Sequence, residues 1–196
     1  SRLSSLRSLF LSYWRSSTAL SGESQVRCLL AAAPPRAAVF LYTVRMKQYW
    51  LMKSEPESYG IEHLKRDKKT AWTGVRNFLA RNYMRQMKVG DLVLFYHSSC
   101  AVPGVYGIAE VVSLPYPDPT QFDPKSPYYE RRATKEKPVW DLVDIKYVST
   151  FTTPVPLASM RENKKLARME ILKPRSRLSV TGVSESEYGE IVRLGC

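Results

Sequence analysis

The chain has 196 residues, a hydrophobic fraction of 44% and a net charge of +12, so it is long enough for one domain with an appendage and too apolar to be disordered. The basic excess favours nucleic acid or an anionic membrane surface as the partner. The three cysteines are widely spaced and form no C-x-x-C pair, which argues against a disulfide framework or zinc site and favours an intracellular protein with reduced thiols.

The first 45 residues differ in composition from the rest of the chain. They contain six arginines, no lysine and one acidic residue, Glu23, and serine is abundant before position 25. This composition is typical of an organelle transit peptide. The alternative is an upstream stretch that does not belong to the natural protein, because Met46 stands directly before the body. Both interpretations exclude residues 1–45 from the fold and predict one domain over residues 46–196.

The first predicted strand, Tyr49–Lys53, is rich in aromatic and large apolar residues and runs directly into a polar segment. Lys53 and Ser54 are neighbours, and neighbouring residues of a strand point to opposite faces. This spacing argues against a nucleophile and base in direct contact. It suits a strand end where one residue lines a pocket and the other fixes its wall.

Two helices are expected next. Residues 58–67 form a short one, with Ser58 as a possible cap, and residues 76–91 form the clearest helix of the chain, ended by Gly90. Apolar residues gather on one side of the longer helix at 3.6-residue periodicity: Leu79, Ala80, Tyr83, Met84 and Met87.

The remainder reads as short strands separated by turns. Strands are predicted at residues 92–97, 104–114, 139–150 and 177–180, helical turns at 156–172 and a helix at 184–194. Gly104 and Gly107 suggest a β-bulge, and Ser184 with Glu187 is placed as a capping box. Residues 115–130 contain five prolines and should form an irregular surface excursion.

These elements predict an α+β fold, a small mostly antiparallel β-barrel flanked by short helices. Few β-α-β spacings occur, so a parallel doubly wound sheet is not expected.

Cationic and aromatic side chains suggest a nucleic-acid site. Arg81, Arg85 and Lys88 recur at i, i+4 and i+7 on one helix face, a cluster that phosphates would stabilise; a solvated helix face is the alternative. Trp72 lies in a polar loop, where an aromatic ring can stack on an unstacked base or simply pack locally. Asn77 opens the helix with an amide that can read a base edge.

Motifs of the common enzyme classes are absent. His63 and His97 lie in different elements and give no metal signature, and there is no P-loop, G-x-G-x-x-G after a strand or G-x-S-x-G. We therefore expect neither a metal nor a cofactor.

The segments "YWLMKSEP", "AWTGVRNFLARNYMRQMKVGDLVLFYHS", "GVYGIAEVV", "YPDPTQF" and "VWDLVDI" together resemble the EVE domain family, in order, from about Met46 to the end of the chain. The resemblance implies a PUA-like fold. It also implies a reader's role, because EVE domains are similar to the YTH domains that hold a methylated adenine in an aromatic cage. EVE domains are thought to bind modified bases in DNA, such as 5-methylcytosine.

The resemblance implies a site at the end of the first strand. Lys53 and Ser54 would stand at the mouth of a base pocket, with Trp72 stacking on the base. Other implied base-pocket residues are Asn77, Tyr96, His97, Ser98 and Tyr106, with Trp50 as a further candidate for a second aromatic wall. The expected phosphate-binding residues are Arg76, Arg81, Arg85 and Lys88.

Two other functions remain open. Related PUA-like ASCH domains include hydrolases of modified nucleosides, for which Lys53 and Glu55 could serve as base and acid. PUA domains generally bind RNA, so the second alternative is an RNA-binding adaptor. We expect a non-catalytic, monomeric reader of modified DNA without a membrane partner. Its expected location is the nucleus in a eukaryote, a mitochondrion if residues 1–45 are a transit peptide, or the cytoplasm of a bacterium.

Overall fold

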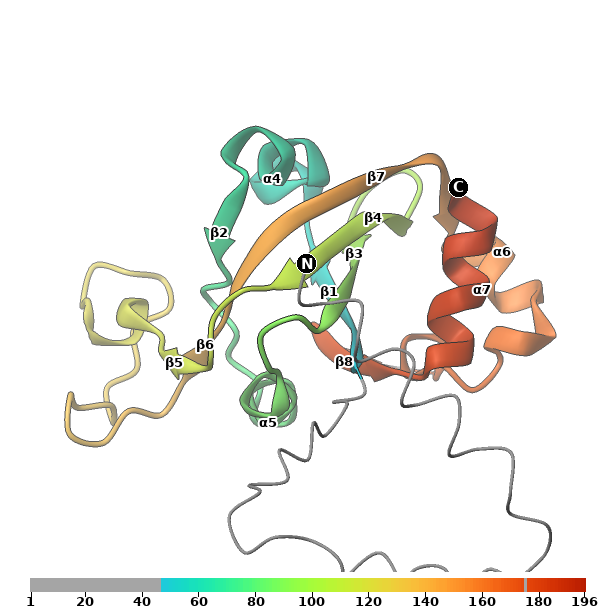
Figure 1. Ribbon diagram of the computed structural model, residues 1–196. Coiled ribbons are helices and arrows are strands. Elements are labelled where there is room, and N and C mark those ends of the chain that lie inside the picture. Colours follow the sequence, from blue (N-terminus) through green and yellow to red (C-terminus); the bar gives the residue numbers. More distant parts are fainter. Residues whose placement is uncertain (1–46, 175) are drawn as a thin grey trace, which may run out of the picture. The chain divides into compact units, whose positions relative to one another are not determined.

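Strand β1 (Tyr49–Ser54) lies next to one edge of the main sheet, between two strands that come later in the chain. It pairs in parallel with β3 (Leu92–His97) and antiparallel with β8 (Val180–Val183). These strands belong to a computed structural model that describes residues 47–174 and 176–196 (Figure 1). The expectations for residues 1–45 lie outside the described residues.

The other side of the sheet is antiparallel throughout. Strand β4 (Gly104–Val111) pairs with β3 and with the long β7 (Asp144–Pro156), and β2 (Lys69–Ala71) covers the far edge of β7. The strand order is β2-β7-β4-β3-β1-β8, and the sheet curves into a half-barrel (Figure 1). The predicted α+β class is therefore confirmed, with two refinements: the sheet is open between β2 and β8, and one strand pair is parallel.

The predicted β-bulge is present in β4. The register against β7 shifts between Val105 and Gly107, where the two backbones approach closely. A Cβ atom on Gly107 would lie 2.3 Å from the carbonyl oxygen of Ser149, which no side chain could tolerate. The glycine therefore permits the close approach that bends the sheet.

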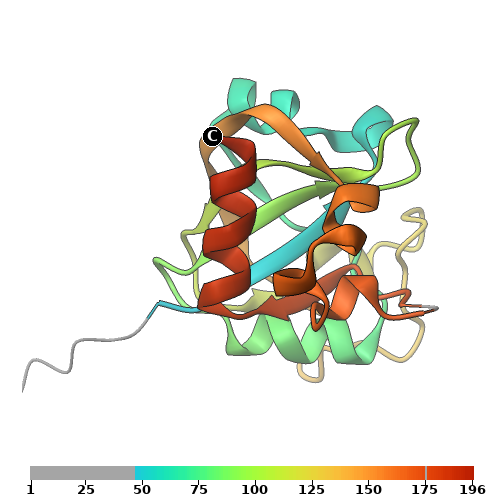
Figure 2. The ribbon, with the colours of Figure 1, turned by 90° about the vertical axis from the view of Figure 1, so that its right-hand side faces the viewer.

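Helices cover the sheet on both sides. Helix α7 (Glu185–Gly195) and α6 (Leu157–Glu162) lie over one face, together with the 3-10 turns η2 (Lys164–Leu166) and η3 (Glu170–Leu172) (Figure 2). The short helices α3 (Pro56–Tyr59) and α4 (Ile61–Asp67) follow β1. The predicted capping box of α7 is confirmed, because Glu187 N donates to Ser184 Oγ and Ser184 N donates to Glu187 Oε2.

Helix α5 (Phe78–Gln86) differs from its predicted form. It ends at Gln86 rather than at Gly90, which instead makes the turn into β3 with a φ of +91°. Ala80, Met84 and Met87 are buried as expected, but the side chain of Leu79 is half exposed. The buried stripe is narrower than predicted, since the helix rests on the sheet through its small and flexible residues.

The predicted excursion after β4 is largely irregular, as expected. It contains the two-residue strands β5 (Tyr116–Pro117) and β6 (Asp141–Leu142), which pair with each other, and the 3-10 turn η1 (Pro119–Phe122). In Figure 1 this segment projects from the sheet beside β2.

Two hydrophobic cores lie on the two faces of the sheet, as strand alternation requires. In β1 and β3, Met52 and Phe95 join one core, whereas Leu51 and Leu94 join the other. Residues from α4 and α5, Trp72 and the inward-facing side chains of the neighbouring strands complete the first core. In the described residues no helix is long and apolar enough to cross a membrane.

Candidate functional site

A cavity of about 490 Å³ lies where β1 and β3 end. Parallel neighbours end at the same edge of a sheet, and here Ser98 N donates a 2.8 Å hydrogen bond to the carbonyl oxygen of Ser54. Lys53 N is held from the other side by the carbonyl oxygen of Ser179, also at 2.8 Å. The cavity is lined by the end of β1, by α3, by residues 70–75 after α4, and by Ser98, Tyr128, Arg177 and Ser179.

Lys53 brings a positive charge to this cavity without a carboxylate that neutralises it. It is half-buried, and no acidic group of the described residues forms an ion pair with it. Burial lowers the pKa of Lys53 below its usual 10.5, because desolvation disfavours the ammonium. The folded protein therefore holds a cation that a bound hydrogen-bond acceptor or anion would stabilise.

Trp72 is both a core residue and a wall of the cavity. Only 8% of its surface is exposed, and its ring packs edge-on against Phe95. The indole Nε1 has no acceptor among the described residues. Because Trp72 lines the cavity, the small exposed part of its ring can contact a ligand there.

Hydroxyl groups complete a polar rim. Ser54, Ser58 and Ser98 line the cavity, and Tyr59 lines it while its hydroxyl donates to Asp67 Oδ2. A ligand with several donors and acceptors would find partners here. Of the predicted base-pocket residues, the structure brings together Lys53, Ser54, Trp72 and Ser98.

The structure does not bring Asn77 to the cavity. Its side-chain Oδ1 accepts hydrogen bonds from Leu79 N at 2.9 Å and Ala80 N at 3.2 Å, as an N-cap does. Asn77 was predicted to read a base edge because it stands at the start of a helix. The same position is where an asparagine caps a helix.

Tyr96, His97 and Tyr106 also lie away from the cavity lining. Tyr96 is buried in the core on the opposite face, where burial raises its pKa to about 12. His97 Nε2 accepts from Ile61 N at 3.0 Å, and its ring stacks on Tyr106 with centroids 4.0 Å apart.

The other candidate wall, Trp50, is a core residue. Its Nε1 donates to Asp91 Oδ2 at 3.1 Å, and it does not line this cavity. Strand alternation and tertiary pairing decide these placements, and residue type alone does not reveal them.

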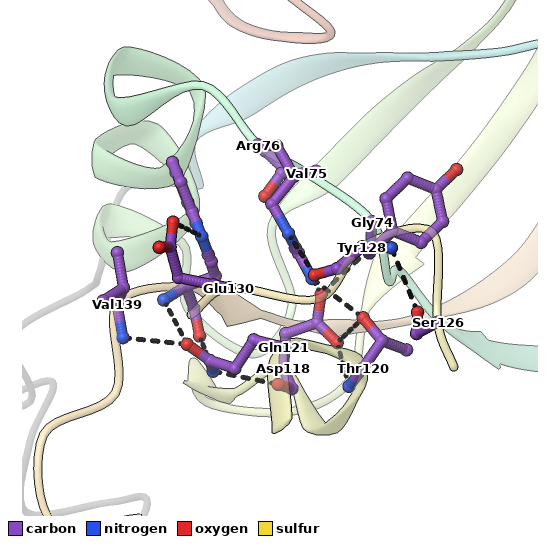
Figure 3. Close-up of polar contacts among 11 residues, drawn as sticks. Gly74, Val75, Arg76, Asp118, Thr120, Gln121, Ser126, Tyr128, Glu130 and Val139 are labelled. Atoms are coloured by element: carbon purple, nitrogen blue, oxygen red, sulfur yellow. Dashed lines mark hydrogen bonds and ion pairs between the residues drawn. The ribbon is translucent and has the colours of Figure 1, made fainter. Parts of the chain in front are cut away.

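Arg76 lies in an internal network that joins the loop before α5 to the excursion (Figure 3). One guanidinium nitrogen donates to Asp118 Oδ2 at 2.8 Å and another to Thr120 Oγ1 at 2.9 Å. Arg76 Nε donates to the carbonyl oxygen of Tyr128. These contacts saturate the guanidinium, which leaves it poorly placed for a phosphate.

The cationic face of α5 is partly used within the domain. Arg81 donates to the carbonyl oxygen of Val139, and Arg85 pairs with Asp141. Lys88 is exposed and forms no side-chain ion pair with the described residues. Arg177, which sequence reasoning missed, lines the cavity and is likewise exposed and without an ion-pair partner among those residues.

Tyr128 was also missed, because it lies in the proline-rich excursion that sequence reasoning treated as surface. No signal in the sequence links it to Trp72. Its placement depends on contacts that join residues far apart in the chain. No group of three or more His, Cys, Asp or Glu that could hold a metal occurs in residues 47–174 and 176–196.

The curved half-barrel, its flanking helices and the cavity at the strand ends define a PUA-like domain. The chain belongs to the EVE domain family, whose pattern it matches over residues 48–194. It is 33% identical to human thymocyte nuclear protein 1 over 202 residues, which cover 94% of this chain and 90% of that protein.

Solved structures show the same fold. A hypothetical protein from Leishmania major is 47% identical, with a TM-score of 0.74 over 76% of this chain and 95% of that chain. Human THYN1 protein in complex with 5-methylcytosine containing DNA is 36% identical, with a TM-score of 0.72 over 76% of this chain and 98% of that chain.

Proposed function

We propose that this EVE domain is a non-catalytic reader that binds DNA and takes a single modified base, a modified cytosine foremost, into the cavity at the ends of β1 and β3. The complex of a 36% identical relative with 5-methylcytosine containing DNA supports the choice of ligand. One observation in this chain carries the choice of site: the cavity has an indole in its wall, Trp72, beside an ammonium that forms no ion pair with the described residues, Lys53.

The proposed binding mode combines stacking with hydrogen bonding. Extruding a base from a duplex costs a few kcal/mol, and stacking on an aromatic ring returns about 1–3 kcal/mol. Lys53 can donate to the oxygen or ring nitrogen of the base, and the hydroxyls of Ser54 and Ser98 can meet its remaining edge. A base inside the cavity would also shield Lys53 from water and strengthen these contacts.

Phosphate contacts would come from cations that the fold leaves unpaired. Arg177 at the cavity is the first candidate, and Lys88 on α5 is a second. Arg81 and Arg85 would contribute charge but less directly, because both already hold the segment from Val139 to Asp141. Such contacts bind all sequences alike and weaken as salt is added.

The proposal is tested by titrating duplexes that differ only in one base, 5-methylcytosine or cytosine, at fixed salt. A 2-aminopurine next to the modified base reports extrusion by its fluorescence. We expect tighter binding and a larger fluorescence rise with 5-methylcytosine. Equal affinity for both duplexes, together with an unchanged 2-aminopurine signal, would contradict the proposal, and tighter binding of a matched RNA would favour an RNA-binding adaptor.

A hydrolase acting on modified nucleosides is the second candidate, because Lys53 and Glu55 line the same cavity and the pKa of Lys53 is lowered by burial. Incubation of the protein with modified nucleosides, followed by chromatography for a free base or a deaminated product, distinguishes the two. Product formation that Lys53→Met abolishes would identify an enzyme.

A further inference from the structure

The cavity has three aromatic side chains. The ring of Tyr59 stacks on His63 and its hydroxyl donates to Asp67, whereas the third, Tyr128, is not used by the proposed function above. Tyr128 lines the cavity together with Trp72, although the two residues lie 56 positions apart in the sequence. The residue is 43% exposed, and its hydroxyl has no hydrogen-bond partner among the described residues. Both the ring and the unpaired hydroxyl of Tyr128 are therefore available to a ligand in the cavity.

The ring of Tyr128 packs directly against Gly74, so closely that no larger residue would fit at position 74. A Cβ atom on Gly74 would lie 2.7 Å from Cζ of Tyr128, and Gly74 has a φ of +84°. Gly74 itself lines the cavity two residues after Trp72. The backbone that carries Trp72 therefore also supports Tyr128, and Figure 3 shows the tyrosine ring over this backbone with its hydroxyl pointing away from the polar network.

Arg76 fixes the main chain of Tyr128. Its Nε donates to the carbonyl oxygen of Tyr128 at 2.8 Å, and a second guanidinium nitrogen donates to the same oxygen at 2.5 Å. The guanidinium also lies over the tyrosine ring, 5.3 Å from its centroid. The residue that sequence analysis assigned to phosphate therefore holds the aromatic ring in place.

Asp118 hydrogen-bonds both residues that support Tyr128, Gly74 and Arg76. One carboxylate oxygen accepts from Gly74 N at 3.0 Å and from Arg76 at 2.8 Å, and the other accepts from the amide and hydroxyl of Thr120. The side chain is only 1% exposed. Burial alone would raise the pKa of Asp118, but the hydrogen bonds from Thr120, Arg76 and Gly74 outweigh it and lower the pKa.

We infer that Tyr128 is a second aromatic wall of the base-binding cavity, and that Asp118 is a positioning residue that sets this wall through Gly74 and Arg76. The inference rests on the proposed function and extends it. A pocket with one aromatic ring contacts only one face of a base. A pocket with two rings contacts both faces, so it can distinguish bases by their shape and by their modification. Tyr128 should therefore contribute to discrimination between bases more than to binding of the duplex as a whole.

The test compares Tyr128→Ala with its neighbour Tyr129→Ala. Tyr129 is 45% exposed, similar to Tyr128, but does not line the cavity. Each variant is titrated with duplexes containing 5-methylcytosine or cytosine. We expect Tyr128→Ala to lower the affinity ratio about tenfold and Tyr128→Phe to retain it, because stacking needs only the ring. Tyr129→Ala should keep the wild-type ratio. An unchanged ratio in Tyr128→Ala would overturn the inference.

A double-variant cycle tests the role of Asp118. Asp118→Asn should lower the same affinity ratio in the wild-type background but have no further effect in Tyr128→Ala, because the residue it positions is already gone. A merely structural role would lower the melting temperature and weaken both duplexes equally, leaving the ratio unchanged. Additive losses in the double variant would also contradict a role exerted through Tyr128.

Trp72→Phe separates this inference from the proposed function. If Trp72→Phe changes the ratio and Tyr128→Ala does not, the cavity binds the base but Tyr128 is no wall of it. If wild-type protein shows no preference for the modified duplex, the proposed function itself fails, and the inference fails with it.

Discussion

The indole of Trp72 meets the ring of Phe95 edge-on, with centroids 5.5 Å apart and planes 86° apart. Phe95 is fully buried in β3, so this contact ties the wall of the cavity to the centre of the sheet. The orientation of the indole is therefore set by the core before any ligand arrives. A pre-oriented ring loses little freedom on binding, which favours selectivity.

The double role of Trp72 predicts that its substitutions separate stability from recognition. Trp72→Ala should cost about 3–5 kcal/mol of unfolding free energy, because it opens a hole beside Phe95. Trp72→Phe should keep most of the stability but reduce the preference for 5-methylcytosine over cytosine, since the ring is smaller and lacks the Nε1 donor. Urea denaturation and duplex titration measure the two effects. A Trp72→Phe variant with full preference would exclude the indole from the reading of the base.

Lys53 should oppose stability and support binding. Its pKa is lowered in the folded state, so as pH rises toward 10.5 the folded protein releases the proton before the unfolded chain does, and stability increases with pH. Lys53→Met should remove this increase and leave the protein at least as stable at neutral pH, while it weakens binding to the modified duplex. Urea midpoints between about pH 8 and pH 10 check the first point. A loss of stability in Lys53→Met at neutral pH would show that the ammonium has a stabilising partner.

His97 should make the domain less stable in acid. Burial lowers its pKa below 6.5, against the opposing effect of the nearby Glu62 carboxylate, and neutral Nε2 accepts from Ile61 N. As pH falls through 6.5 the unfolded chain binds the proton first, so stability decreases. His97→Gln should flatten this decrease, measured as urea midpoints at about pH 7.5 and 5.5. An unchanged slope in His97→Gln would show that His97 is not the source.

Asn77 should contribute to stability and not to recognition. Asn77→Ala removes the acceptor of Leu79 N and Ala80 N and should cost about 1 kcal/mol, whereas Asn77→Asp keeps the cap and should cost little. Thermal denaturation of both variants measures the difference. Both should bind the modified and plain duplexes in the wild-type ratio. A changed ratio in Asn77→Ala would return this residue to the base-reading site that its position in the sequence suggested.

Arg177 should carry phosphate binding more than Arg85. Arg177→Ala should weaken both duplexes alike and reduce the slope of log affinity against log salt by about 0.9, the value of one phosphate contact. Arg85→Ala breaks its pair with Asp141 and should change this slope less. Titrations at four salt concentrations give the two slopes. A larger change for Arg85 would show that α5, and not the cavity rim, lies along the backbone.

The elements that could be predicted from sequence are those set by local pattern. The strand at 49–53, the bulge at Gly107 and the capping box of α7 depend on residues near one another in the chain, and all three are present. The end of α5 was placed too late, because Gly90 signals a left-handed turn but does not say whether a helix still reaches it. Leu79 was placed in the core by periodicity alone, yet about half of its surface is exposed.

Apart from Trp72, which the family resemblance implied, the candidate site could be predicted only at the ends of strands. Lys53, Ser54 and Ser98 lie at the ends of β1 and β3 and meet because these two strands are parallel, a pairing that the sequence did not predict. Tyr128 and Arg177 reach the cavity from loops whose course depends on tertiary contacts. No periodicity or spacing in the sequence reports such contacts.

Gln121 joins the two ends of the excursion at its base. It accepts from Val139 N and Trp140 N and donates to the carbonyl oxygens of Asp118 and Trp140, all from a fully buried side chain. The loop between Gln121 and Val139, which brings Tyr128 to the cavity, is therefore closed at its base by one buried side chain. Because the two ends of the loop are tied together, its length could be changed without moving the strands, and an engineer could use it to graft new specificity onto an unchanged scaffold.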